Sequence, residues 1–211
     1  TVENDQGEGR YVNIRGISGD LNSIAVNGAL VPAPEGGRTV MLDGLPTELL
    51  DSIEVYKSLT ADKDADSIGG RIEFNTKRAT SIDGTLLKVK LDTSYNTQSK
   101  NGDNPKMALT YGSMISDNVG HVLGVTYASK QIVTYNNETG FPAWDTENGN
   151  IFLDDDWGMR FYDLTRERTG ITYDIDMVID DNTSVYANFL YNHYEDDELR
   201  NKEEFGSLRT G

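Results

Sequence analysis

The stretch LPTELLDSIEVYKSLTADKDADSIGGRIEFNTK, residues 45–77, decides the fold of the first part of the chain. Pro46 suits the first turn of a short helix, because the N–H that proline lacks would be unpaired there. Apolar and polar residues alternate over 53–56 and over 72–75, which predicts two strands. The glycine pair at 69–70 has no Cβ, so we expect a sharp turn and a close approach to another segment.

The loop between these two strands is acidic. Asp62, Asp64, Asp66 and Glu73 have the spacing of positions 1, 3, 5 and 12 of a calcium-binding loop. Ser67 stands where such a loop needs glycine for its turn, and no helix is predicted on either side. Because a motif without its structural context is weak evidence, we expect no metal site and no cofactor.

Four short segments form an ordered set of motifs. They are 11–16 (YVNIRG), 25–28 (AVNG), 52–57 (SIEVYK) and 67–77 (SIGGRIEFNTK). Their order resembles the plug domain of TonB-dependent outer-membrane receptors, in which an IRG strand, a DG hairpin, an IEV strand and an IGG strand follow one another. Asn27 replaces the usual aspartate. Four ordered matches are more specific than any one of them. The resemblance implies that the motif glycines are Gly16, Gly28, Gly69 and Gly70.

The composition argues against several classes of function. A formal net charge of −16 disfavours nucleic acid as a partner and disfavours a peripheral protein held to anionic lipid by a polybasic patch. The absence of cysteine rules out a disulfide scaffold and any cysteine-based site. Only His121 and His193 are present, without metal-site spacing, so no histidine-built zinc or catalytic site is expected. No run of about 18 apolar residues predicts a membrane-spanning helix.

The pattern changes after residue 78, where five runs alternate apolar and polar side chains. They lie at 85–95, 107–112, 123–128, 171–177 and 185–192. Tight connectors at 116–120 and 180–183 alternate with longer ones at 97–104 and 136–156. Five such runs, each with room for roughly 9–11 residues, are typical of transmembrane β-barrel strands. A soluble antiparallel sheet with one face exposed to water shows the same alternation. The plug motifs favour the transmembrane barrel over this alternative.

We therefore predict a mainly β fold. A small α+β plug domain, of which residues 1–78 are the C-terminal part, precedes antiparallel strands of an outer-membrane β-barrel at 79–211. Residues 1–10 are polar and contain glycine, which predicts a loop. The resemblance implies the plugged 22-stranded class, of which about five strands are present. We interpret the chain as a fragment that lacks the start of the plug and most of the barrel.

The resemblance also implies a function: energy-coupled import of a scarce nutrient across the outer membrane of a Gram-negative bacterium. The implied partners are outer-membrane lipid, a small-molecule ligand, and the inner-membrane energy-coupling protein TonB, which would pull on a segment preceding Thr1. Residues 10–16 and 59–66 most resemble a proteobacterial branch often linked to oligosaccharide uptake. Ferric-siderophore uptake is the alternative, and a secreted β-rich carbohydrate-binding module is the alternative from another class. No convergent catalytic group is found, so no enzyme is predicted.

Candidate ligand-binding residues lie in three loops. Aromatic rings beside acidic groups suit the apolar faces and hydroxyls of sugars, although such residues also fold loops or lie at membrane boundaries. The candidates are Trp144, Asp145 and Trp157 at the long connector, and Asp5, Gln6, Glu8, Pro32 and Glu35 in plug loops that face outside in related receptors.

Two basic residues of the plug strands are candidates for anchoring. In the family, basic side chains at the positions of Arg15 and Lys57 pair with barrel-wall carboxylates. A charge removed from water needs such a partner. The alternative is that both are solvated charges at strand ends.

Overall fold

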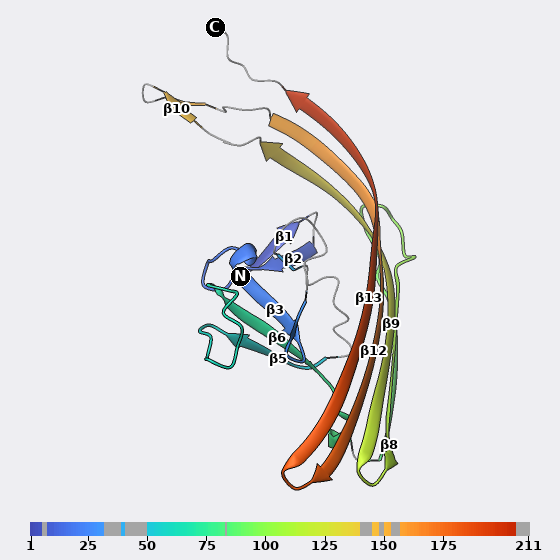
Figure 1. The fold of residues 1–211 in the computed structure, drawn as a ribbon. Coiled ribbons are helices and arrows are strands. Elements are labelled where there is room, and N and C mark those ends of the chain that lie inside the picture. The colour runs from blue at the N-terminus through green and yellow to red at the C-terminus, as the bar shows by residue number, and fades with distance from the viewer. Residues whose placement is uncertain are drawn as a thin grey trace.

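The computed structural model describes residues 1–5, 8–31, 39–40, 50–82, 84–139, 145–147, 150–152 and 157–205. Strands dominate, joined by short 3-10 turns such as η1 (Gly19–Leu21) and η4 (Ala79–Ser81), and no α-helix occurs among these residues. The helix predicted from Pro46 lies outside the described residues. A small N-terminal unit sits on the concave side of a long curved sheet (Figure 1). The predicted, mainly β fold is confirmed.

The N-terminal unit is built on a four-stranded sheet in the order β4-β3-β6-β5. Its strands are β3 (Asn22–Val26), β4 (Ala29–Leu30), β5 (Leu50–Tyr56) and β6 (Gly70–Thr76). β3 and β6 are parallel, whereas β5 pairs antiparallel with β6. Both predicted strands, 53–56 and 72–75, are therefore confirmed. The buried core is small and consists of Ile14, Ile24, Val26, Val40, Ile72 and Phe74.

Residues 1–10 are not a loop, as the sequence predicted, but contribute to a hairpin. β1 (Val2–Asp5) pairs antiparallel with β2 (Glu8–Val12). The base of the hairpin is closed by Asn13, whose N–H donates to the carbonyl of Thr1 at 2.8 Å. The prediction failed because this hairpin is held by backbone pairing, which a polar sequence makes as well as an apolar one.

The close approach expected of the glycine pair is present. A Cβ on Gly70 would lie 2.6 Å from the carbonyl oxygen of Tyr56. A Cβ on Gly69 would lie 2.0 Å from Oδ1 of Asn22. The amide of Asn22 in turn donates to the carbonyl of Val12 at 2.9 Å. The glycines therefore allow the chain to enter β6 directly beside the segments it packs against.

The acidic loop and Glu73 do not gather around a common point. Glu73 is buried, forms an ion pair with Arg71 at 2.9 Å, and accepts a hydrogen bond from the Gly28 N–H. Asp62 is exposed and accepts a hydrogen bond from the Thr60 hydroxyl. Among the described residues, no group of three or more His, Asp or Glu side chains is placed to hold a metal ion.

The curved sheet contains five antiparallel strands in the order β13-β12-β9-β8-β7. They are β7 (Thr85–Thr93), β8 (Pro105–Ser116), β9 (Val119–Thr139), β12 (Trp157–Asp180) and β13 (Thr183–Phe205), with a small β10 (Asp145–Glu147) and β11 (Asn150–Phe152) hairpin between β9 and β12. Four of the five alternating runs fall on one strand each, and the run at 85–95 falls on β7 except for its last two residues, which confirms the strand prediction.

Three of these strands are much longer than the roughly 9–11 residues expected from the width of a bilayer. β9 has 21 residues, β12 has 24 and β13 has 23. The expectation counted only the apolar runs, but the backbone ladder continues beyond them through charged residues. The connector predicted at 136–156 is therefore partly strand, because β9 extends to Thr139.

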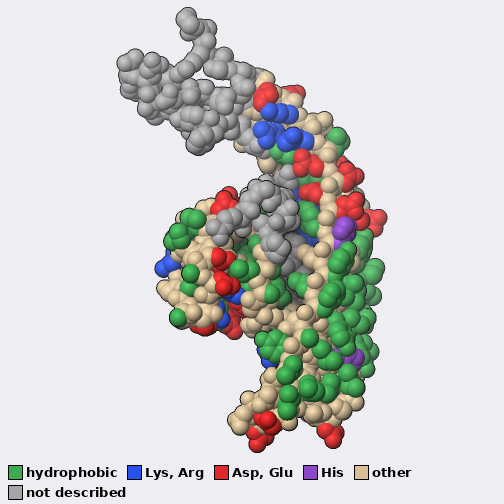
Figure 2. Space-filling model, viewed as in Figure 1, with side chains coloured by type: hydrophobic (Ala, Val, Ile, Leu, Met, Phe, Trp, Pro, Cys, Tyr) green, Lys and Arg blue, Asp and Glu red, His purple; other side chains and the backbone are tan. Residues whose placement is uncertain are grey.

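The convex face of the curved sheet carries an apolar band. Its central cross-strand row consists of Val89, Leu109, Val125, Ile171 and Tyr191, which lie opposite one another in register. Val89 is 62% exposed, and Figure 2 shows the band as a broad apolar surface. A continuous exposed apolar surface of this kind is typical of lipid-facing barrel strands. No helix formed by the described residues is long and apolar enough to span a bilayer.

Candidate functional site: the contact between the N-terminal unit and the curved sheet

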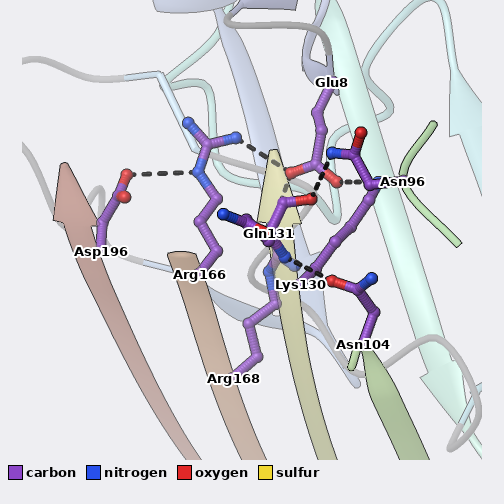
Figure 3. Close-up of polar contacts among 8 residues, drawn as sticks. All are labelled: Glu8, Asn96, Asn104, Lys130, Gln131, Arg166, Arg168 and Asp196. Carbon is purple, nitrogen blue, oxygen red and sulfur yellow. Dashed lines mark hydrogen bonds and ion pairs between the residues drawn. The ribbon is translucent and has the colours of Figure 1, made fainter. Parts of the chain in front are cut away.

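The side chain of Glu8, at the start of β2, reaches the concave face of the curved sheet. Its Oε1 accepts a hydrogen bond from Lys130 Nζ on β9 at 2.6 Å. Its Oε2 accepts from Arg166 Nη1 and from Arg168 Nη2 on β12, each at 2.9 Å. Figure 3 shows the carboxylate between the three cations. We call these four residues the Glu8 contact.

Strand register explains why three cations meet on this face. Arg166 and Arg168 are two residues apart on β12 and therefore point to the same side of the sheet. Lys130 lies directly opposite Arg166. Like charges placed opposite one another on neighbouring strands destabilise a sheet unless an anion lies between them. Glu8 supplies that anion from one side, and Asp196 on β13 supplies another by accepting from Arg166 Nε at 3.2 Å.

The electrostatic environment keeps Glu8 ionised. Burial disfavours the charged carboxylate and by itself would raise its pKa. The hydrogen bonds from Lys130 and Arg166, together with the charge of Arg168, outweigh burial and lower the pKa of Glu8 from 4.5 to about 2. The Arg166 side chain is 0% exposed, so its charge depends on these carboxylate partners.

A polar loop holds the part of β9 from which Lys130 projects. β8 begins at Pro105, so the backbone of β9 has no strand partner from β8 at Gln131. The loop replaces that partner, since Asn96 Nδ2 donates to the Gln131 carbonyl at 3.1 Å and the Gln131 N–H donates to Asn104 Oδ1 at 2.6 Å. Figure 3 shows both asparagines beside Gln131. These bonds fix the backbone next to the Glu8 contact.

A second contact joins the end of β6 to the same sheet. The Thr76 hydroxyl donates to Asp174 Oδ1 at 3.1 Å, and the Ala79 N–H donates to Asp176 Oδ2 at 2.8 Å. Both aspartates lie on β12, two residues apart, and are 1% and 4% exposed, respectively. Asn188 on β13 also donates to Asp174. We call Thr76, Ala79, Asp174 and Asp176 the Asp174 contact.

Of the predicted ligand-binding residues, Glu8 belongs to the contact between the two units. Asp5 ends β1, Asp145 begins β10 and Trp157 begins β12. The remaining four candidates lie outside the described residues: Gln6, Pro32, Glu35 and Trp144. The ligand-binding role of all these residues stays a prediction.

The two predicted anchoring residues lie within the N-terminal unit. Arg15 adopts φ of 55°, and its Nη2 donates to the carbonyl of Gly69 at 3.1 Å. Lys57 follows β5 and is exposed. Their anchoring role stays a prediction. In the Glu8 contact, by comparison, the N-terminal unit provides the carboxylate and the sheet provides the cations.

Sequence reasoning did not identify the sheet residues of either contact. These are Lys130, Arg166, Arg168, Asp174 and Asp176. A usable signal was present, because extending the alternation of 171–177 toward the N-terminus places both arginines on the polar side with the two aspartates. The same extension predicts that the strand begins well before residue 171, near the expected end of the connector at 136–156.

Comparison with known families bears on the N-terminal unit. Residues 1–71, which are 71 of the 211, match the family model of the TonB-dependent Receptor Plug Domain. No curated protein matches the chain significantly. The family match supports a TonB-dependent receptor of the bacterial outer membrane and indicates a receptor or transporter rather than an enzyme.

Proposed function

We propose that this chain is part of a receptor that imports a scarce nutrient across the outer membrane with energy delivered through TonB. The observation that carries the proposal is the Glu8 contact, in which a plug-like unit is tied to the concave face of a sheet whose convex face is apolar. A barrel whose lumen is closed by a movable domain needs an attachment of this kind between that domain and its inner wall.

The contact is suited to opening under force. One carboxylate receives all three hydrogen bonds, so moving a single side chain breaks them together. The Asp174 contact lies where the chain passes from β6 toward β7, and it keeps the plug beside the sheet after the Glu8 contact has opened. Pulling on the plug would then open a path along the polar, concave side of the sheet.

We propose an oligosaccharide as the substrate. The proposal rests on the resemblance of residues 10–16 and 59–66 to receptors linked to oligosaccharide uptake, and on the aromatic and acidic residues of 136–156. An iron chelate is the second candidate. It is favoured by the three cations around Glu8, because many iron chelates are anionic and cations attract them.

Uptake by living cells tests the function. Cells that produce the full-length receptor should accumulate labelled oligosaccharides saturably, and deleting TonB or the receptor should abolish accumulation. Accumulation that is independent of TonB would overturn the proposal. A purified protein that stays soluble without detergent would instead favour the secreted carbohydrate-binding module.

A reversible cross-link tests whether the plug must move. These 211 residues contain no cysteine, so Glu8→Cys with Lys130→Cys places one new thiol on each unit, and a short reducible bifunctional reagent can join the two. We expect uptake to stop after cross-linking and to return after reduction. The two single cysteine variants, treated with the same reagent, are the matched controls. Unchanged uptake by the cross-linked receptor would contradict an opening at this contact.

A further inference from the structure

We propose that Lys130, Arg166 and Arg168 form a carboxylate-binding site of the receptor, and that Glu8 occupies it until a carboxylate of the substrate takes its place. The inference rests on the proposed function and specifies its substrate. It predicts an acidic ligand, either an oligosaccharide that contains uronic acid or an iron chelate that carries carboxylates. The shared recognition element is the carboxylate.

The geometry around Glu8 is that of a complete carboxylate site. Both carboxylate oxygens accept hydrogen bonds from charged donors, at 2.6 Å from Lys130 and at 2.9 Å from each arginine. Guanidinium groups match the planar carboxylate better than other cationic side chains do. A ligand carboxylate that enters the position of the Glu8 carboxylate can accept the same three hydrogen bonds.

The site is held in shape by the curved sheet and not by Glu8. Asp196 accepts from Nε of Arg166 and thereby leaves Nη1 directed at the carboxylate. The guanidinium of Arg168 lies over the ring of Tyr194, 5.7 Å from its centroid. The backbone beside Lys130 is fixed by the asparagine loop described above. The three cations therefore stay preorganised when the plug withdraws, which lowers the cost of binding a second anion.

An empty site would be unfavourable. Removing Glu8 leaves Lys130 and Arg166 directly opposite each other, with Asp196 as the carboxylate that still accepts from Arg166. An incoming carboxylate cancels that repulsion, whereas a neutral sugar does not. Substrate binding and release of the Glu8 contact are therefore coupled, and each favours the other.

Glu8 is also in the right place for this exchange. It begins β2, and residues 4–8 are one of the plug segments from which we predict ligand contact. A ligand that reaches Glu8 meets the three cations in the same place. The formal net charge of −16 makes a cluster of three cations a local exception, which gives an acidic ligand a defined target.

Calorimetry on the full-length receptor in detergent tests the inference. The probes are trigalacturonate with neutral maltotriose, and ferric citrate with a neutral ferric trihydroxamate. We expect one carboxylate probe to bind more tightly than its neutral counterpart, and which one binds identifies the source of the carboxylate. Glu8→Gln should tighten that binding at least about tenfold, because a competing internal anion is removed.

Variants of the site separate recognition from folding. Lys130→Gln should weaken binding of the carboxylate probe about tenfold, and Lys130→Arg should restore it because the charge is kept. Lys77→Ala, which removes an exposed ion pair with Asp51 elsewhere in the plug, should leave binding unchanged. A structural defect would affect neutral and charged probes alike.

Three results of the binding measurements would overturn the inference. They are a neutral probe that binds as tightly as its carboxylate counterpart, carboxylate binding that Glu8→Gln and Lys130→Gln leave unchanged, and a Glu8→Gln receptor that binds neither carboxylate probe. TonB-dependent uptake of a neutral oligosaccharide would leave the proposed function intact and would still reject a carboxylate site. The two proposals therefore fail separately.

Discussion

The Glu8 contact and the Asp174 contact join the same two units with different chemistry. At Glu8, long charged side chains meet across the gap between β2 and the sheet. At Asp174, a short side chain and a backbone N–H donate to aspartates directly beside the covalent connection between the units. The Glu8 contact depends on charge and on the length of the side chains, whereas the Asp174 contact depends on its position beside the covalent connection.

The difference between the two contacts explains how a plug can move and still stay attached to the sheet. The Ala79 N–H is held close to Asp176 by the chain itself, so this contact re-forms at a high effective concentration. The β1–β2 hairpin instead reaches the sheet through Glu8, whose ionic contacts with Lys130, Arg166 and Arg168 join segments far apart in the chain. We therefore expect the plug to pivot about the Asp174 contact.

The largest expected effect comes from Arg166→Met. This change removes the ion pairs of the buried guanidinium to both Glu8 and Asp196, so both carboxylates lose one charged partner. Breaking a buried pair by removing one partner costs about 3–5 kcal/mol. Native-state hydrogen exchange should show that β1 and β2 open more readily by this amount.

Arg168→Met is the matched control for Arg166→Met. Arg168 forms an ion pair with Glu8 and is 15% exposed, so its loss should have a smaller effect on hydrogen exchange. Equal effects of the two substitutions would contradict the central position that we assign to Arg166.

The next effect is a dependence on acid pH. The pKa of Glu8 is lowered from 4.5 to about 2 in the docked plug, so its contribution is complete above pH 4.5 and is lost as the pH falls toward 2. The shift corresponds to about 3 kcal/mol of docking free energy. A fluorophore on Glu3→Cys should report release of the hairpin over this interval, and Glu8→Gln should abolish that dependence.

Asp176→Ala should have an intermediate effect at the other contact. The substitution leaves the Ala79 N–H without its acceptor in a buried position, which costs about 1–3 kcal/mol. Hydrogen exchange should accelerate near Ala79 and remain unchanged in β1 and β2. Simultaneous opening of both contacts in this variant would show that they form one cooperative unit. That result would contradict the distinction between the Glu8 contact and the Asp174 contact.

The smallest effect is expected for Lys77→Ala. Lys77 forms an ion pair with Asp51 at 2.7 Å, and the two side chains are 35% and 57% exposed. Exposed pairs of this kind contribute about 0–1 kcal/mol. Thermal unfolding of this variant should follow that of the wild type, and a loss as large as that of Arg166→Met would mean that burial does not distinguish the ion pairs.

Strands could be predicted where side-chain periodicity reflects burial or contact with lipid. The run around Val125 and Ile171 alternates because one face carries the apolar band and the other carries small and polar residues on the concave side of the sheet. The same logic missed the hairpin at Val2–Asp5, which is held by backbone pairing, and underestimated the lengths of β9 and β12. In the first half of β12 the alternation continues in charged side chains, which a count of apolar runs leaves out.

The site was harder to predict than the strands. Glu8 was predicted to contact ligand because it lies in a plug loop, but its partners are more than 120 residues away in sequence, with Lys130 at a separation of 122. Which inward-facing charges meet Glu8 depends on the register of β9 against β12 and on where the plug sits. Neither quantity can be read from local sequence patterns.

A double-mutant cycle between Glu8 and Arg166 tests the central claim most directly. The opening free energy of the β1–β2 hairpin would be measured by hydrogen exchange for wild type, Glu8→Gln, Arg166→Gln and the double variant. If the ionic contact holds the plug to the sheet, the coupling energy should be about 2 kcal/mol or more. Effects that add to within about 0.5 kcal/mol would show that the two side chains act independently and would contradict the account.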